Sequence, residues 1–132
     1  MAKKIRTHRD LEVYKLAYAA SMRIFWLTHE FPREEIYSLT SQIRRSSRSV
    51  SSGVCEAWRR RRYEPAFVSN LNESETEAAE TQVWIQYAVD CKYMPRTVGV
   101  ELFQEYDRIL GMLVGMINRP EVWVIGQSAT SK

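Results

Sequence analysis

Apolar side chains recur every three or four residues along most of this chain, which is the spacing of helices that each bury one face. Thr7 and Asp10 are spaced as a capping box, in which the two side chains bind backbone N–H groups of a first helical turn. A first helix is therefore expected from this point to just before Pro32. Its expected apolar stripe is Leu11, Tyr14, Tyr18, Met22 and Phe25.

Pro32, followed by glutamates at 34 and 35, predicts the start of a second helix, because proline suits a first turn and acids suit the positive end of the helix dipole. Five serines between residues 46 and 52, together with Gly53, lower helix propensity and favour a kink. Small side chains also let a neighbouring helix approach closely, so we expect a packed, slightly bent helix rather than a break. Its apolar positions, within a sector of roughly 60°, are Ile36, Leu39, Ile43, Val50, Val54 and Ala57.

Proline also marks the turn into a third helix at Tyr63-Glu64-Pro65, because it disfavours helix in the residue before it. A fourth helix is expected from about Thr97 to Asn118, where Gly111 and Gly115 indicate tight packing. The third helix has the expected stripe Phe67, Leu71, Ala78, Val83 with Ile85, Tyr87 and Cys91. The fourth has Val98, Leu102, Tyr106, Ile109, Leu113 and Ile117.

Four amphipathic helices with short connections predict an all-α fold, an antiparallel up-and-down four-helix bundle, because short loops make consecutive helices neighbours. A length of 132 residues suits one domain, expected over residues 1–120, and five glycines and four prolines leave few turns for an all-β fold. Residues 121–132 are expected to form a C-terminal tail. Its apolar stretch 122–125 should dock on the bundle or on a neighbouring subunit.

The sequence offers no residue for catalysis, metal or cofactor binding, so we expect no enzyme. His8 and His29 lack the glutamate three residues earlier that di-iron bundles use. Cys55 and Cys91 stand alone and are expected to be buried, and the four tryptophans to be core or interface anchors. No apolar run approaches the ~18 residues of a membrane span, and no secretion signal follows the basic start. A cytoplasmic protein with no membrane partner is therefore expected.

Charge is strongly segregated, although the net charge is only +3. Residues 41–62 hold seven arginines against one acid, Glu56, whereas residues 64–90 hold six acids and neither lysine nor arginine. In a continuous helix, four of these arginines fall within about 60° of one another, away from the apolar face. Because guanidinium groups suit phosphate oxygens, the arginines are candidate contacts to RNA or DNA. They are Arg44, Arg45, Arg48, Arg59, Arg60, Arg61 and Arg62, of which the four are Arg44, Arg48, Arg59 and Arg62.

A second interpretation stays open beside this one. The arginines could pair with the acids of the adjacent third helix, within one chain or between chains, in a scaffold that binds a partner protein. Under the first interpretation they face solvent; under the second they are neutralised structurally.

Several segments resemble the four-helix-bundle protein family named after the 23S rRNA intervening sequence. They include Asp10-Leu11-Glu12-Val13-Tyr14, Tyr37-Ser38-Leu39-Thr40-Ser41-Gln42-Ile43-Arg44-Arg45 and Ala78-Ala79-Glu80-Thr81-Gln82-Val83-Trp84. The resemblance implies a homopentamer of poorly defined role, suspected to bind nucleic acid. Residues 50–57 depart from the family pattern, since its proline, asparagine and final glycine are missing. Beside Arg44 and Arg45, the matched polar positions are Gln42, Glu56 and Glu80, which are candidates for a structural network between helices two and three.

Overall fold

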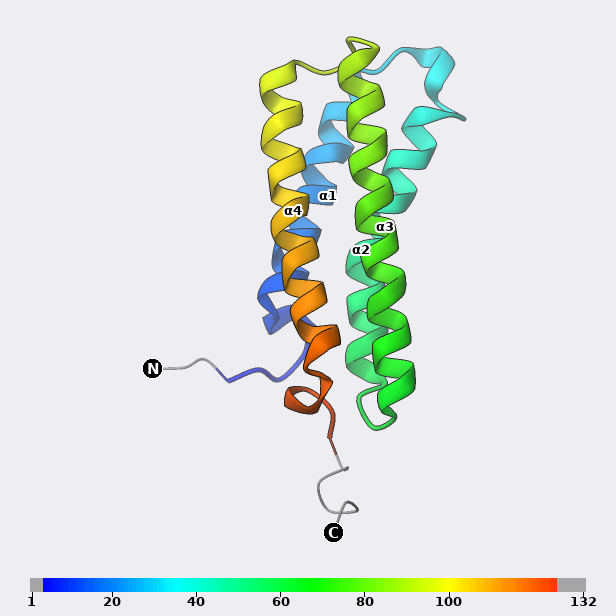
Figure 1. Cartoon of the computed structure of the whole chain (residues 1–132). Coiled ribbons are helices and arrows are strands. Elements are labelled where there is room, and N and C mark those ends of the chain that lie inside the picture. Colours follow the sequence, from blue (N-terminus) through cyan, green and yellow to red (C-terminus); the bar gives the residue numbers. More distant parts are fainter. Residues whose placement is uncertain (1–3, 126–132) are drawn as a thin grey trace.

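The computed structural model describes residues 4–125 and places four α-helices side by side (Figure 1). They are α1 (Glu12–Leu27), α2 (Leu39–Arg59), α3 (Glu64–Asp90) and α4 (Arg96–Asn118). Short 3₁₀ turns cover His8–Asp10, Thr28–Glu30, Arg33–Glu35 and Pro120–Val122, and the described residues contain no strand. The predicted all-α fold of four helices is confirmed.

Each helix packs against two neighbours around one core. α2 and α4 both contact α1 and α3, so α1 lies diagonally across from α3. The α2–α3 loop lies at the end of the bundle where the chain also enters and leaves, and the other two connections lie at the opposite end (Figure 1).

The first helix buries a different face from the predicted one. The capping box of Thr7 and Asp10 is present, but it closes a 3₁₀ turn, and α1 begins at Glu12. Tyr18 and Met22 are exposed. The sequence of α1 carries two adjacent stripes of apolar residues at helical spacing. The bundle buries the stripe with the smaller side chains, which lets α1 lie close to its neighbours. That stripe is Val13, Ala17, Ala20 and Ile24.

The second helix begins later than predicted and is unbroken. Arg33–Glu35 forms only a 3₁₀ turn, and the backbone at Ser38 (φ −132°, ψ −107°) redirects the chain before α2. Ile36 is consequently 49% exposed rather than in the core. The other predicted core residues of this helix are buried, but α2 ends at Arg59, so Arg62 lies in the following loop and off the predicted helical stripe.

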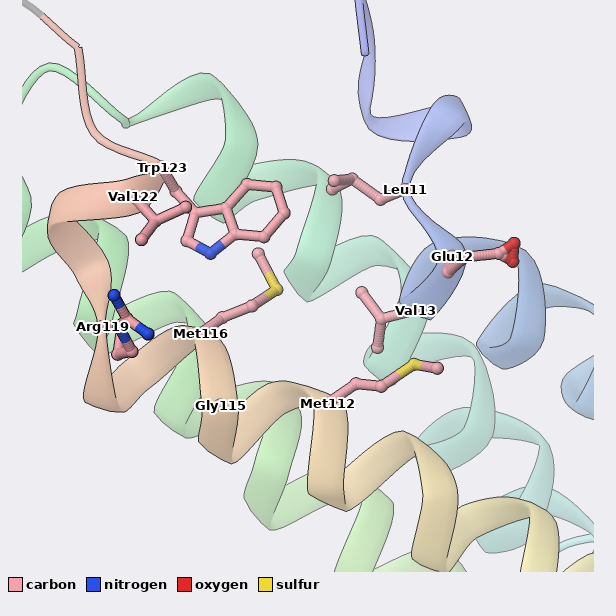
Figure 2. A pocket seen from close by; sticks show the side chains of 9 residues that line it. All are labelled: Leu11, Glu12, Val13, Met112, Gly115, Met116, Arg119, Val122 and Trp123. Carbon is pink, nitrogen blue, oxygen red and sulfur yellow. The ribbon is translucent and has the colours of Figure 1, made fainter. Parts of the chain in front are cut away.

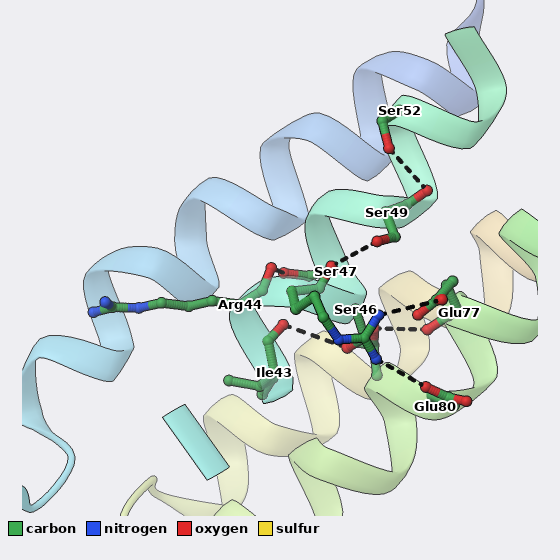
Figure 3. Close-up of polar contacts among 10 residues, drawn as sticks. Ile43, Arg44, Ser46, Ser47, Ser49, Ser52, Glu77 and Glu80 are labelled. Carbon is green, nitrogen blue, oxygen red and sulfur yellow. Dashed lines mark hydrogen bonds and ion pairs between the residues drawn. The ribbon is translucent and has the colours of Figure 1, made fainter. Parts of the chain in front are cut away.

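Small side chains bring α2 and α3 into close contact, as predicted. A Cβ atom at Gly53 would overlap the Oγ of Ser74, which donates a hydrogen bond to the carbonyl of Val50 (3.1 Å). Nearby, the hydroxyls of Ser46 and Thr81 share a hydrogen bond of 2.8 Å. Other serines of α2 donate to carbonyls of their own helix (Figure 3). We call the contact through Ser46, Gly53, Ser74 and Thr81 the α2–α3 seam.

Polar residues in this seam explain why the predicted face of the third helix was partly wrong. Buried positions of α3 follow a regular spacing of three and four residues, but Ser74 and Thr81 are among them. An apolar pattern misses such positions, and Val83, Tyr87 and Cys91, which the pattern placed inside, are exposed. The buried positions are Phe67, Asn70, Leu71, Ser74, Ala78, Thr81, Gln82, Ile85 and Ala88.

The fourth helix buries the predicted Leu102, Tyr106, Ile109 and Leu113. The expectation of tight packing at Gly111 and Gly115 was wrong, because both are exposed and a Cβ at either would meet no atom within 4 Å. The close approach occurs instead at Gly99, where a Cβ would overlap Val89.

The described part of the C-terminal tail docks on its own bundle. Trp123 packs beside Leu11 and Met116 at a hollow of about 400 Å³ between the start of α1 and the end of α4 (Figure 2). The N–H of Ile125 donates to the carbonyl of Arg61 (3.1 Å). The chain after α4 thus braces the α2–α3 loop, while residues 126–132 of the predicted tail lie outside the described part.

We expect Gly53→Ala to lower the free energy of unfolding by about 1–3 kcal/mol, because the new methyl group displaces the Ser74 hydroxyl from its hydrogen bond. Gly111→Ala is the matched control: it enters open space on an exposed helix face and should stabilise by up to about 1 kcal/mol. Chemical denaturation measures both. In a Ser74→Ala background the cost of Gly53→Ala should shrink, and an unchanged cost would contradict the overlap as its cause.

The two connections at one end of the bundle are linked by a hydrogen bond from the Tyr93 hydroxyl to Glu35 Oε2 (2.9 Å). This bond, with partial burial and the charge of Glu35, raises the pKa of Tyr93 to about 12 from 10.0. The backbone N–H of Leu39 and then the Tyr93 hydroxyl lower the pKa of Glu35. The hydrogen bond between Tyr93 and Glu35 therefore stabilises the fold at pH values where Glu35 is ionised and Tyr93 is protonated.

We expect the melting temperature advantage of the wild type over Tyr93→Phe to be present below the ordinary tyrosine pKa and to disappear as pH rises toward 12. In acid, the contribution of Glu35 should be lost as pH falls below 4.5 through its lowered folded-state pKa. Thermal melts of both proteins across pH check this. A gap between the two that stays constant from neutral to strongly alkaline pH would contradict the assignment.

Candidate nucleic-acid interface

The seven candidate arginines occupy three different surroundings in the structure: beside α3, beside α1, and around the α2–α3 loop. Arg45 turns toward α3, where its guanidinium lies 3.5 Å from Glu77 and 3.6 Å from Glu80, the two acids labelled in Figure 3. The side chains of Arg45 and Glu80 are each about half exposed, so their ion pair contributes little to stability. Among the seven arginines, Arg45 alone forms ion pairs within residues 4–125.

Arg44 and Arg48 turn the other way, toward α1. Arg44 Nε donates to Thr28 Oγ1 (2.8 Å), and its guanidinium lies over the ring of Phe25, 5.0 Å from the ring centroid. Arg48 lies over the same ring at 5.7 Å. Figure 3 shows Arg44 reaching across α1, away from Glu77 and Glu80. These contacts order the two cations without neutralising them.

Arg60 and Arg61 are held at the α2–α3 loop. Arg61 Nε donates to the carbonyl of Trp58 (2.8 Å), and its guanidinium lies 3.5 Å from the Trp58 ring centroid. Burial, and then the charges of Arg59 and Arg62, lower the pKa of Arg61, but an arginine stays cationic at neutral pH. Arg60 Nη1 donates to Asn70 Oδ1 (3.4 Å).

Arg59 and Arg62 are exposed and make no hydrogen bond or ion pair with the described residues. They flank the two held arginines in the sequence, and the charge of each lies close enough to Arg61 to lower its pKa. Four consecutive cations thus stand at the end of the bundle with no acidic partner among residues 4–125.

The three residues predicted to form a polar network between α2 and α3 do not form a single network. Glu56 Oε1 accepts from Asn70 Nδ2 (3.2 Å), so it belongs to a contact between α2 and α3. Glu80 joins the same two helices through Arg45. The side chain of Gln42 is exposed and contacts neither acid. A polar link that sequence reasoning did not predict joins Gln82 to Asp107 of α4 (2.9 Å).

Sequence reasoning also missed an aromatic cluster beside Arg44 and Arg48. Phe25, Trp26 and His29 project from the end of α1, and the indole of Trp26 stacks on His29 with a centroid separation of 5.2 Å. Trp26 is 63% exposed, so its predicted role as a core anchor was wrong within this chain. The signal was the spacing of residues 22, 25, 26 and 29, which places apolar and aromatic side chains on one helix face.

The remaining chemistry of the described residues is sparse. Cys55 is half-buried and Cys91 exposed, so their predicted burial was wrong. Residues 4–125 contain no cluster of three histidine, cysteine, aspartate or glutamate side chains placed to hold a metal ion. Within the same part of the chain, no helix is long and apolar enough to span a bilayer.

The fold and this basic helix define a class of protein: four helices, of which the second carries more arginines than any other. The chain belongs to the 23S rRNA-intervening sequence protein family, whose model matches residues 9–115. A solved structure with the same fold is a protein of unknown function from the S23 ribosomal protein family of Bacteroides thetaiotaomicron. It is 23% identical with a TM-score of 0.73, over 80% of this chain and 95% of that one. No curated protein matches the sequence.

Proposed function

We propose that this chain is a non-catalytic, cytoplasmic protein that binds RNA or DNA phosphates through the arginines of α2 and of the loop that follows it. The protomer is an antiparallel up-and-down bundle that assembles as a homopentamer. The observation that carries the proposal is the orientation of the arginines: the acids of α3 pair with Arg45 and leave the other six without an ion pair among residues 4–125.

The continuity of α2 supports this function. Arg44, Arg48 and Arg59 lie within about 60° around an unbroken helix and span roughly 22 Å along it. A row of cations with free N–H donors is suited to successive phosphates, whatever their sequence. Glu77 and Glu80 lie on the other side of Arg45 from Arg44 and Arg48, where they would repel a phosphate backbone.

Oligomerisation would multiply these contacts. Exposed apolar side chains on adjacent helices, Val83 and Tyr87 of α3 with Val100 and Phe103 of α4, support a subunit contact. The number five comes from the family resemblance. Five copies of a weak phosphate-binding surface give useful avidity where a strand can reach several of them.

We expect affinity for a mixed panel of RNA and DNA to fall steeply between two salt concentrations, because binding releases counterions. Arg59→Ala/Arg62→Ala should weaken binding to every sequence and reduce the slope of log affinity against log salt by about 1–2. Fluorescence anisotropy measures both quantities.

The matched control is Arg96→Ala/Arg108→Ala, which removes the same charge from exposed positions of α4, diagonally across the bundle from α2. It should leave affinity close to that of the wild type. Undetectable or salt-independent binding by the wild type would overturn the proposed function. Equal losses in the two double variants would show that total charge, not this surface, governs binding.

A second function, a scaffold for a partner protein, is favoured by the contact of Arg45 with Glu77 and Glu80. If this contact serves assembly, Arg45→Glu should lower the melting temperature by a few degrees and shift the protein to smaller oligomers, because three acids then crowd one site. Nucleic-acid affinity should not change.

Light scattering and thermal melts test this, with Arg108→Glu as the control, since the one ion pair of Arg108 within residues 4–125 is with Glu105 of its own helix. An unchanged oligomer with lost nucleic-acid binding would contradict the scaffold function. A protein that purifies as a nucleic-acid-free monomer would contradict both functions.

A further inference from the structure

An exposed indole lies beside ordered cations at one rim of the α1–α2 contact. Trp26 stacks on His29 with an interplanar angle of 21°, and Phe25 packs edge-on against both rings. His29 is fixed in turn, since its Nδ1 lies 2.9 Å from the carbonyl oxygen of Phe25. Despite these two contacts, Trp26 is 63% exposed.

The cations of this site are held in place by the same cluster. Phe25 carries the guanidinium groups of Arg44 and Arg48 on its ring, and Thr28 fixes Arg44 through its Nε. The N–H groups on Nη1 and Nη2 of Arg44 make no hydrogen bond to residues 4–125. Arg33 and Arg44 both line an adjacent hollow of about 310 Å³. Glu30 is the acid on this turn, and it pairs with none of these arginines in the described chain.

We propose that Trp26 is a stacking platform for an unpaired base, with Arg44 and Arg48 binding the adjoining phosphates, so that the preferred ligand is single-stranded nucleic acid. This inference rests on the proposed function and adds the strandedness of the ligand. An aromatic face beside guanidinium groups is the combination that binds single strands, because unpaired bases expose faces that a duplex conceals.

The platform is aligned with the rest of the basic surface. Arg59 lies eleven residues beyond Arg48 on the unbroken α2, which places it about 16 Å further along and about 20° around the helix. A strand stacked on Trp26 can therefore continue along the same side of α2 toward the α2–α3 loop. The positive charge along this path favours a polyanion as the molecule bound there. The exposed apolar faces of α3 and α4 on a second copy of the chain would suit it less well.

The test compares the wild type with Trp26→Leu, which keeps an apolar side chain but removes the ring. The probes are fluorescein-labelled rU12 and dT12, a duplex of equal length, and a twelve-unit abasic strand that carries phosphates without bases. We expect Trp26→Leu to weaken binding to rU12 and dT12 by about 5- to 100-fold, the loss of one stacked base. Affinity for the duplex and the abasic strand should not change.

Tyr18→Leu is the matched control, since it removes an exposed ring from the same helix about two turns before Trp26, and it should bind all probes as the wild type does. If the wild type binds single strands and duplex equally and Trp26→Leu alters neither, stacking is overturned while the proposed function stands. If Trp26→Leu dissociates the oligomer and loses affinity for all probes alike, Trp26 is a subunit contact and stacking is overturned. If the wild type binds none of the probes, both proposals fail.

Discussion

The close contact between α2 and α3 is the constraint on which the rest of the structure depends. Gly53 leaves no room for a side chain against Ser74, and Ser46 bonds to Thr81 across the same contact. Because these side chains are small and their hydroxyls are hydrogen-bonded, α2 and α3 can lie close together along the seam. The bulky residues of each helix are consequently directed to the core or outward.

This contact also separates the charges. With α2 fixed against α3, the position one residue after Arg44 faces the acids, and Arg44 and Arg48 face α1. A rotation of α2 about its axis by one residue, or about 100°, would change which arginine meets the acids of α3 and which meets the aromatic ring of α1. At this level of α2, Arg45 therefore meets two acids of α3, whereas Arg44 and Arg48 are directed toward α1.

How well the fold could be predicted varied with the chemistry of each helix. In α2 and α4, large aliphatic residues mark one face, and the predicted core was largely confirmed. In α1 two apolar stripes compete, and packing chose the smaller one. In α3, Ser74 and Thr81 belong to the core because partners in α2 satisfy their hydroxyls, which no pattern within α3 reveals. The exposed Trp26 follows from the same choice in α1.

By itself, the sequence determined that the chain forms four helices, that no glycine-rich phosphate loop or di-iron ligand pattern is present, and that arginines crowd the second helix. Helical periodicity and charge are properties of a segment, so they can be read along the chain. Only the tertiary structure decided which arginines meet an acid, which meet an aromatic ring, and which stay open to solvent. Those outcomes depend on the rotation and separation of neighbouring helices, which contacts such as Gly53 with Ser74 set across the bundle.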